Sequence, residues 1–444
     1  MTPPPGSIPE PAFEGATADG GALVLRDGVA ARSPLEELLA KGRLRATLSM
    51  LGPAFVASIA YVDPGNFATN LQGGAKFGYL LLWVVLLANL IAMLIQYLSA
   101  KLGVVSGQNL PQHIRERWPR PLTWGMWLQA EVMAMATDIA EFLGAALGLN
   151  LLFGVPLFPA GIMTGAIAFA MLELQHHGFR RFELAISALL GIIFLGLLYE
   201  TLNIGPSAHD SLHGLIPGLS GASSLYLAVG IIGATVMPHV IYLHSALTQG
   251  RMPVRSDAEK ARVLRFERVD VVVALGLAGL VNLAMLAIAA KLFHSPGLSG
   301  LSTIPQAHME FGRLVGGGAA LAFAVALFAS GASSSSVGTY AGQVVMAGFI
   351  NVRIPVMIRR ALTMVPALVI LALGMNPTDA LVLSQVVLSF GIPLAVIPLV
   401  MLTSRRDVMG AHVNRPITTV LAWGCAGLIT ALNLFLVYQQ FFGG

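Results

Sequence analysis

The sequence predicts an all-α membrane protein that crosses the lipid bilayer many times. Hydrophobic residues make up 56% of the 444 residues and charged residues only 11%, and the mean hydropathy is +0.76. Soluble domains carry about 25% charged residues. The apolar runs are about 18 to 30 residues long, which is enough for a helix to cross about 30 Å of hydrocarbon. Strands of a membrane barrel would alternate over roughly ten residues, and that pattern is absent.

The chain divides into a polar tail and a transmembrane domain. Residues 1–44 are rich in Pro, Gly and Ala, so we expect a disordered cytoplasmic tail. The tail lacks the basic and then apolar order of a signal peptide. Residues 45–443 are expected to form the transmembrane domain. Its eleven apolar segments are expected at about 46–74, 79–100, 122–149, 157–175, 182–203, 223–249, 269–292, 318–349, 355–374, 379–403 and 417–442.

The positions of the basic residues predict the orientation of these segments. With eleven spans, all but three of the 26 Lys and Arg residues fall on the side of the N-terminus. The exceptions are Lys76, Lys291 and Arg313. Because cytoplasmic loops are enriched in Lys and Arg, we expect the N-terminus in the cytoplasm and the C-terminus outside a cell membrane. The net charge of +4 then follows from topology, and no nucleic-acid partner is needed to explain it.

The first apolar segment is interrupted by Asp63-Pro64-Gly65-Asn66. Pro64 has no N–H group and clashes with the preceding helical turn, and Gly65 frees the backbone. A carboxylate is expensive in lipid, so Asp63 is expected to face a cavity, a partner or an ion. This stretch predicts a helix that breaks at mid-depth and points polar groups inward.

The sixth segment has a matching interruption at Met237-Pro238-His239. Paired broken helices in corresponding positions of two halves are typical of transporters built from inverted repeats. We therefore expect one repeat at about 46–203, a second at about 223–403, and an additional helix at 417–442. Broken helices supply free backbone carbonyls and helix ends at the membrane midplane, where ions and substrates can bind.

The two interruptions together offer a cation several kinds of ligand. Asp63 supplies a carboxylate, Asn66 an amide and Met237 a thioether, and the freed carbonyls are expected to be those of Ala60 and Ala234. Oxygen ligands alone suit Mg²⁺ and Ca²⁺, whereas a sulfur ligand favours softer first-row transition metals. The alternative is that Met237 only packs in the apolar interior.

The two motifs resemble those of the Nramp family of proton-coupled divalent-metal transporters. The resemblance covers nearly all of residues 46–442, including the flanking runs 57–61 and 230–239. It implies the LeuT-type fold of ten core helices, with alternating access and with Mn²⁺ and Fe²⁺ as substrates. It also implies that Cd²⁺ and Co²⁺ are accepted and that Ca²⁺ and Mg²⁺ are discriminated against. The metal is cargo, and no resident cofactor is expected.

The same resemblance implies a set of metal-binding residues. These residues match the family motifs or lie beside them. Position 240 is Val where many proteins of the family have Asn, and this departure leaves the ligands intact. The residues are Asp63, Asn66, Met237, Ala60, Ala234 and Gln385.

A proton pathway is expected beside this site. Glu131, Asp138 and Glu141 have a spacing that places all three on one face of the third segment. Acids inside a membrane mark ion or proton paths by default, although a structural ion-pair network is the alternative. Arg359 and Arg360 are the expected counter-charges, or else mark the membrane boundary. The expected pathway comprises Asp63, Glu131, Asp138, Glu141, His239, Arg359 and Arg360, whereas His244 is expected to pack.

Three other functions remain to be distinguished. A sodium-coupled transporter of organic solutes would hold a substrate carboxylate at helix N-termini, where Asp63 would repel it. A metal channel would lack proton coupling. An enzyme is disfavoured because no nucleophile–base pair, phosphate loop or zinc motif is present, and the lone Cys425 excludes an intramolecular disulfide. We expect the protein to work as a monomer.

Overall fold

The computed structural model describes residues 40, 42, 52–176, 179–254, 256–294, 303–352 and 354–442. The expected N-terminal tail and the start of the first segment therefore lie, apart from two residues, outside the described residues. All regular elements within the described ranges are helical. They are α3 (Pro53–Ala60), α4 (Pro64–Phe77), η1 (Gly78–Leu81), α5 (Leu82–Ser106), α6 (Leu110–Arg117), α7 (Arg120–Phe153), α8 (Leu157–His176), α9 (Phe179–Ile204), α10 (Ala208–His213), α11 (Ala222–Thr235), α12 (Pro238–Thr248), α13 (Asp257–Phe293), α14 (Ile304–Leu314), α15 (Gly317–Ile350), α16 (Val356–Ala372), α17 (Pro377–Thr403), α18 (Arg406–Met409), η2 (Gly410–His412) and α19 (Pro416–Phe442).

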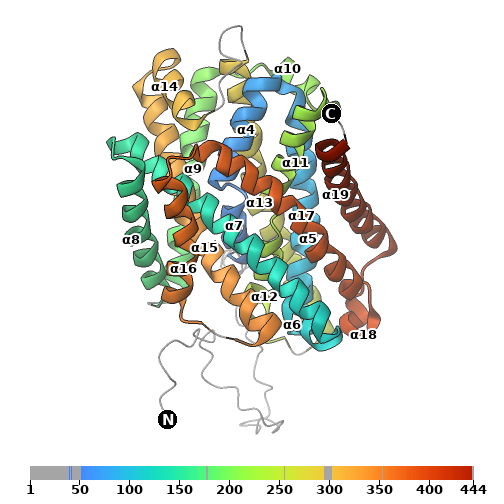
Figure 1. Cartoon of the computed structure of the whole chain (residues 1–444). Coiled ribbons are helices and arrows are strands. Elements are labelled where there is room, and N and C mark those ends of the chain that lie inside the picture. The colour runs from blue at the N-terminus through green and yellow to red at the C-terminus, as the bar shows by residue number, and fades with distance from the viewer. Residues whose placement is uncertain are drawn as a thin grey trace.

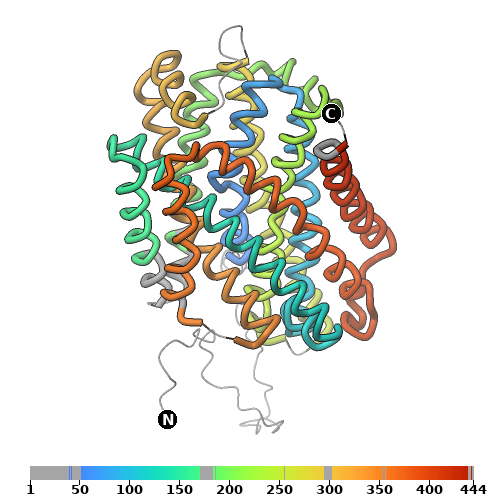
Figure 2. The backbone as a smooth tube through the Cα atoms, viewed as in Figure 1, coloured from blue at the N-terminus to red at the C-terminus, as the bar shows by residue number. Residues whose placement is uncertain are grey.

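The long helices form a bundle with two distinct ends (Figure 1). We call the end with α10 and α14 the upper end and the end with α6 and α18 the lower end. The helix α7 crosses the bundle obliquely in front of α15, and α8 and α16 lie at one edge of the view. In Figure 2 the tube runs upward from α18 through α19, along the edge of the view opposite α8 and α16. The short helices α6, α10, α14 and α18 thus lie at the ends of the bundle.

Eight segments of the described chain are long and apolar enough to cross a membrane. One of them, from Pro64 to Ser106, runs through α4, η1 and α5, and another, from Ala222 to Thr248, runs through α11 and α12. The expectation of many membrane-spanning helices is confirmed. The helices α8 and α16 occupy the expected segments 157–175 and 355–374.

Some helices extend clearly beyond the expected apolar segments. The helix α13 begins at Asp257, twelve residues before the expected start at 269, because Ser256 accepts a hydrogen bond from the Glu259 N–H and caps a charged first turn. The helix α7 runs from Arg120 to Phe153 rather than over 122–149. Apolarity located the part of each helix that suits a membrane, whereas capping and helix propensity decide where the helix itself begins and ends.

The centre of the bundle is packed closely through small residues. The helix α7 packs along α15, and α13 packs along α4 and α5. A methyl group on Gly331 of α15 would lie 2.5 Å from the backbone nitrogen of Ala145 on α7. All four serines of Ser333–336 are buried in the same helix. These small side chains let the two helices approach, as is typical of membrane bundles.

Candidate metal site

The first interruption separates α3 from α4 at Tyr61–Asp63. Pro64 is the first residue of α4, where its missing N–H costs nothing, and Asp63 is the N-cap. Oδ1 of Asp63 accepts hydrogen bonds of 2.8 Å from both the backbone N–H and the side-chain Nδ2 of Asn66. Both side chains are fully buried. The sequence Asp-Pro-Gly-Asn thus both ends one helix half and begins the next, with a carboxylate at the start of the second.

The second interruption separates α11 from α12 at Val236–Met237. Met237 is the N-cap of α12 with extended backbone, and Pro238 is the first helical residue. The thioether of Met237 makes no capping hydrogen bond, and the residue is fully buried. Its side chain is therefore not committed to holding the helix end.

Asn66 connects the two interruptions. Its Nδ2 donates to the Ala234 carbonyl oxygen over 3.0 Å, in addition to Asp63. The hydroxyl of Thr235 donates to Oδ1 of Asn66 over 3.5 Å, which is a long contact. The carboxylate, the amide and the last turn of α11 are thus brought together within the bundle, as expected for Asp63, Asn66 and Ala234.

Gln385 of α17 approaches the same point. Its Nε2 lies 3.4 Å from Oδ2 of Asp63, the carboxylate oxygen that does not cap α4. Two glycines make this approach possible. A methyl group on Gly65 would overlap the Gln385 side chain, and one on Gly233 would overlap the Gln385 backbone carbonyl. Gln385 is buried, and its Oε1 has no hydrogen-bond partner among the described residues.

Side chains of other helices hold the backbone between α3 and α4. The Asn282 Nδ2 of α13 donates to the Tyr61 carbonyl over 2.7 Å, and the Ser330 hydroxyl of α15 donates to the Val62 carbonyl over 2.5 Å. These two carbonyls are therefore already paired. Ala60, one residue earlier, is fully buried at the end of α3.

These groups can bind a cation through several kinds of donor. Within the described residues no three His, Cys, Asp or Glu side chains gather as a metal site. Of the six residues expected to bind the metal, only Asp63 would supply a carboxylate, and the others would supply amide and carbonyl oxygens and one thioether. Such a set combines hard oxygen ligands with a softer sulfur ligand.

The acids of α7 meet the expected arginines of α16. Arg360 donates to Oδ1 of Asp138 over 3.1 Å, and Arg359 pairs with Glu131 at 2.7 Å. Arg360 also donates to Ser335 and to the Thr339 hydroxyl. Both arginines are buried against other helices, so neither side chain extends to the surface of the protein.

Glu141 lies beside Asp138 but forms no ion pair with the arginines of α16 among the described residues. A methyl group on Gly338 of α15 would lie 2.6 Å from Oε2 of Glu141 and 3.2 Å from Oδ1 of Asp138. The Glu141 carboxyl accepts no well-formed hydrogen bond from the described residues. Asp138 and Glu141 therefore share one face against α15, whereas Glu131 meets Arg359.

The two histidines of α12 are both hydrogen-bonded. Nδ1 of His239 lies 3.2 Å from the Thr137 hydroxyl on α7. Nδ1 of His244 lies 2.9 Å from Oε1 of Gln96, whose Nε2 donates to the Tyr61 hydroxyl over 2.5 Å. His244 was expected only to pack, and it instead belongs to this polar chain. The available signal was the presence of polar residues within two apolar segments.

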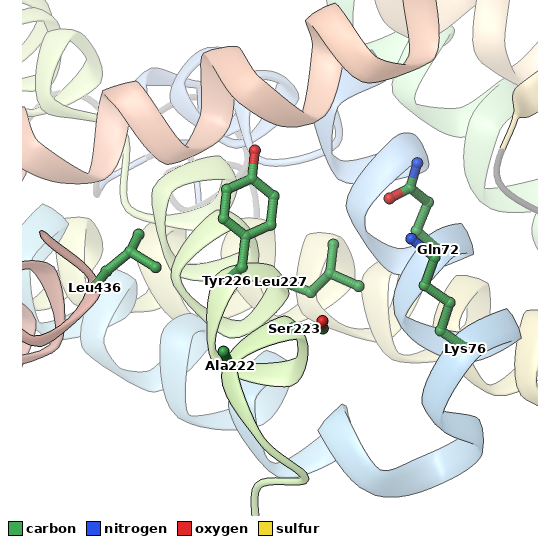
Figure 3. A pocket seen from close by; sticks show the side chains of 7 residues that line it. All are labelled: Gln72, Lys76, Ala222, Ser223, Tyr226, Leu227 and Leu436. Carbon is green, nitrogen blue, oxygen red and sulfur yellow. The ribbon is translucent and has the colours of Figure 1, made fainter. Parts of the chain in front are cut away.

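A hollow opens at the upper end between the two broken helices. It has a volume of about 300 Å³ (Figure 3). The figure shows Gln72 and Lys76 on α4 facing Tyr226 and Leu227 on α11, with Leu436 of α19 at the side. Ala222 and Ser223 complete the lining. The sequence carries no pattern that would have indicated this hollow.

Comparisons with known proteins agree with these features. Residues 54–439 match the family profile described as Nramp, natural resistance-associated macrophage protein-like. The divalent metal cation transporter MntH of Deinococcus radiodurans is 54% identical over 396 residues, 89% of this chain and 91% of the relative. The MntH of Bacillus subtilis is 50% identical over 398 residues, 89% of this chain and 93% of the relative.

Solved structures show the same likeness. A variant of the manganese transporter of Eremococcus coleocola superimposes with a TM-score of 0.81 at 33% identity, covering 90% of this chain and 89% of that chain. The nucleobase-cation-symport-1 transporter Mhp1 superimposes with a TM-score of 0.57 at 15% identity, covering 87% and 90%. The protein MhsT does so with 0.57 at 13%, covering 88% and 98%, and these last two show a likeness of fold alone. The chain is a multi-pass membrane protein that belongs to the Nramp family.

Proposed function

We propose that this protein is a secondary active transporter that imports divalent transition metals together with protons by alternating access. Mn²⁺ and Fe²⁺ are the expected substrates, and Cd²⁺ and Co²⁺ are accepted. The family is one of transporters rather than enzymes. The observation that carries the proposal is the meeting of Asp63, Asn66 and Ala234 at two helix interruptions that lie buried within the bundle.

The proposed ligands are the residues at and beside the two interruptions: Asp63, Asn66, Met237, Ala60, Ala234 and Gln385. Asn66 Nδ2 donates to oxygens of both Asp63 and Ala234. A cation that takes those oxygens must displace the N–H groups, which leaves Oδ1 of Asn66 free to turn toward the ion. The thioether of Met237 disfavours Ca²⁺ and Mg²⁺, which prefer oxygen ligands.

Protons are proposed to travel through the acids of α7. Asp63 would release a proton when the metal arrives, or Asp138 would do so in its place. Arg360 pairs with Asp138 and Arg359 pairs with Glu131, so a proton that binds either acid leaves its arginine unpaired, which favours passing the proton on. Glu141 and His239 complete the proposed path, because each has an unpartnered polar atom among the described residues.

The proposed architecture is a pair of inverted repeats of five spans, at about 46–203 and 223–403, with the first and sixth helices broken. The helix at 417–442 is an addition to this LeuT-type core. The lower end carries Arg115, Arg117 and Arg405, so we place it in the cytoplasm of a bacterial cell, with the C-terminus outside. The proposed active unit is a monomer.

The decisive experiment measures Mn²⁺ uptake and proton influx together in proteoliposomes with a pH-sensitive dye. Asp63→Asn keeps an oxygen to cap α4 but removes the charge, so it should fold and should lose uptake. Asp379→Asn, a change at an exposed acid, is the matched control and should transport normally. Full uptake by Asp63→Asn would contradict the site. Mn²⁺ flux without proton flux would contradict the coupling and favour a channel.

A further inference from the structure

Glu200 is a buried acid that the proposed mechanism does not use. It lies near the upper end of α9, four residues before the helix ends at Ile204. Only 1% of the residue is exposed, and Oε1 has no hydrogen-bond partner among the described residues. We infer that Glu200 is a second proton-binding site, separate from the acids of α7, which binds its proton as the upper half of the protein closes.

The cavity beside Glu200 is lined by apolar side chains. These side chains belong to Leu197, Phe67, Leu71, Met285, Ile288, Phe311 and Phe323. The cavity has a volume of about 10 Å³, which is enough for roughly one water molecule. Such a water needs two to four polar partners, and the lining offers only the carboxyl. An ionised Glu200 would therefore be a buried charge with almost no solvation, which is strongly unfavourable.

No opposite charge compensates for this environment. The helices that line the cavity are α4, α9, α13, α14 and α15. The other charged and titratable groups on these helices near the upper end form no ion pair or hydrogen bond with Glu200 among the described residues. These other groups are Lys76, Tyr199, Lys291, His308, Glu310 and Arg313. In this arrangement, with the cavity covered by α4 and α14, the carboxyl is therefore expected to hold a proton.

Under the proposed alternating access, α4 moves when the upper half opens, and α4 forms one wall of the cavity. Phe67 and Leu71 lie on α4, the upper half of the first broken helix. Phe67 meets Phe323 edge to face at 5.9 Å, and Phe323 stacks on Phe311 of α14 at 5.0 Å. This aromatic group seals the carboxyl beneath α4 and α14. When α4 moves away, water reaches Glu200 and the proton can leave as hydronium.

The inference rests on the proposed alternating access and adds a proton to one step of it. Closure of the upper half transfers one proton from water on the upper side to the Glu200 carboxylate, and reopening returns it. Acid on the upper side therefore favours the closed form. A single linked proton changes the ratio of closed to open molecules about tenfold per pH unit, over the range in which only the closed form holds it.

The test measures opening directly, without metal. Thr69 of α4 is fully buried, and a methyl group on Gly230 of α11 would lie 3.4 Å from its Cγ2. Thr69→Cys in a Cys425→Ser background therefore places a thiol in the seam between the upper halves. Its maleimide labelling rate is compared with and without Glu200→Gln at each pH, so that the ionisation of the thiol cancels in the ratio. We expect the ratio of the rate with Glu200 to the rate with Gln to rise by up to about tenfold per pH unit between about pH 5 and 7.

The controls keep this outcome separate from the failure of transport itself. Glu310→Gln removes a carboxylate from α14, where it pairs with Arg313 at the surface, and should label like the parent. Glu200→Leu suits the apolar cavity and replaces Glu200→Gln if the latter does not fold. A ratio that stays constant with pH would overturn the inference even if Mn²⁺ uptake is normal. If the parent protein takes up no Mn²⁺ but the ratio of labelling rates still rises with pH, the result counts against the proposed function and not against this inference.

Discussion

Two glycines of α11 provide a matched test of how closely the site is packed. Gly230 and Gly233 are three residues apart and both face neighbouring helices. A methyl group on Gly230 would lie 3.4 Å from Thr69 Cγ2 and 3.5 Å from Val386 Cγ2, which are ordinary contacts. A methyl group on Gly233 would overlap the carbonyl of Gln385. The substitutions Gly230→Ala and Gly233→Ala therefore make the same chemical change but differ in the room available for the added methyl group.

The expected effects have opposite signs. Replacing Gly by Ala inside a helix contributes about 0.4–1 kcal/mol of stability through the unfolded chain. Gly230→Ala should show this gain. At Gly233 the overlapping atoms belong to the backbone of α17 and cannot rotate away, so the two helices must separate. Overpacking of this kind costs about 1–3 kcal/mol, which outweighs the gain.

The assay is thermal unfolding of the purified protein in detergent, combined with Mn²⁺ uptake. Gly230→Ala should unfold at or above the parent temperature and keep its uptake. Gly233→Ala should unfold several degrees lower and lose much of its uptake, because displacement of the Gln385 backbone moves its Nε2 away from Oδ2 of Asp63. Equal stability of the two variants would refute the close approach of α11 and α17.

Three further predictions concern other contacts of the described residues. Met237→Ala should weaken discrimination against Ca²⁺ and Mg²⁺ more than it weakens Mn²⁺ transport; in a competition assay, unchanged selectivity would show that the thioether only packs. Asp138→Asn should destabilise the protein by about 3–5 kcal/mol by leaving Arg360 unpaired, and adding Arg360→Gln should restore part of the loss in unfolding experiments. No recovery in the double variant would mean that the pair is not coupled. Asp270→Asn should cost about 1–3 kcal/mol, because Asp270 accepts from the Ala54 N–H at 2.9 Å and from the Gly52 N–H at the start of α3; an unchanged unfolding midpoint would contradict this role.

Local chemistry predicted the interruptions well. Pro64 and Pro238 each begin a new helix because proline disrupts the turn before it, and this effect needs no knowledge of the rest of the fold. The side chains that gather at the interruptions follow from the same signal. Their roles in metal binding stay predictions.

Partners that are distant in the sequence were harder to predict. Arg359 and Arg360 were expected near the acids of α7, but the sequence does not say that Arg360 meets Asp138 and Arg359 meets Glu131, which depends on how α16 rotates against α7. Glu200 gave no signal at all. A single acid near the end of an apolar segment is typical of a membrane boundary, and only the packing of helices far apart in the sequence buries it.

The carbonyls of Tyr61 and Val62 have a mechanical consequence. Each is held by a side chain from a helix outside the broken one, Asn282 from α13 and Ser330 from α15. The backbone between α3 and α4 is thus held in place by two hydrogen bonds from neighbouring helices and is not a flexible linker. Because this connection is anchored to α13 and α15, we expect substitutions along α3 and substitutions along α4 to affect the movements of the two helix halves independently.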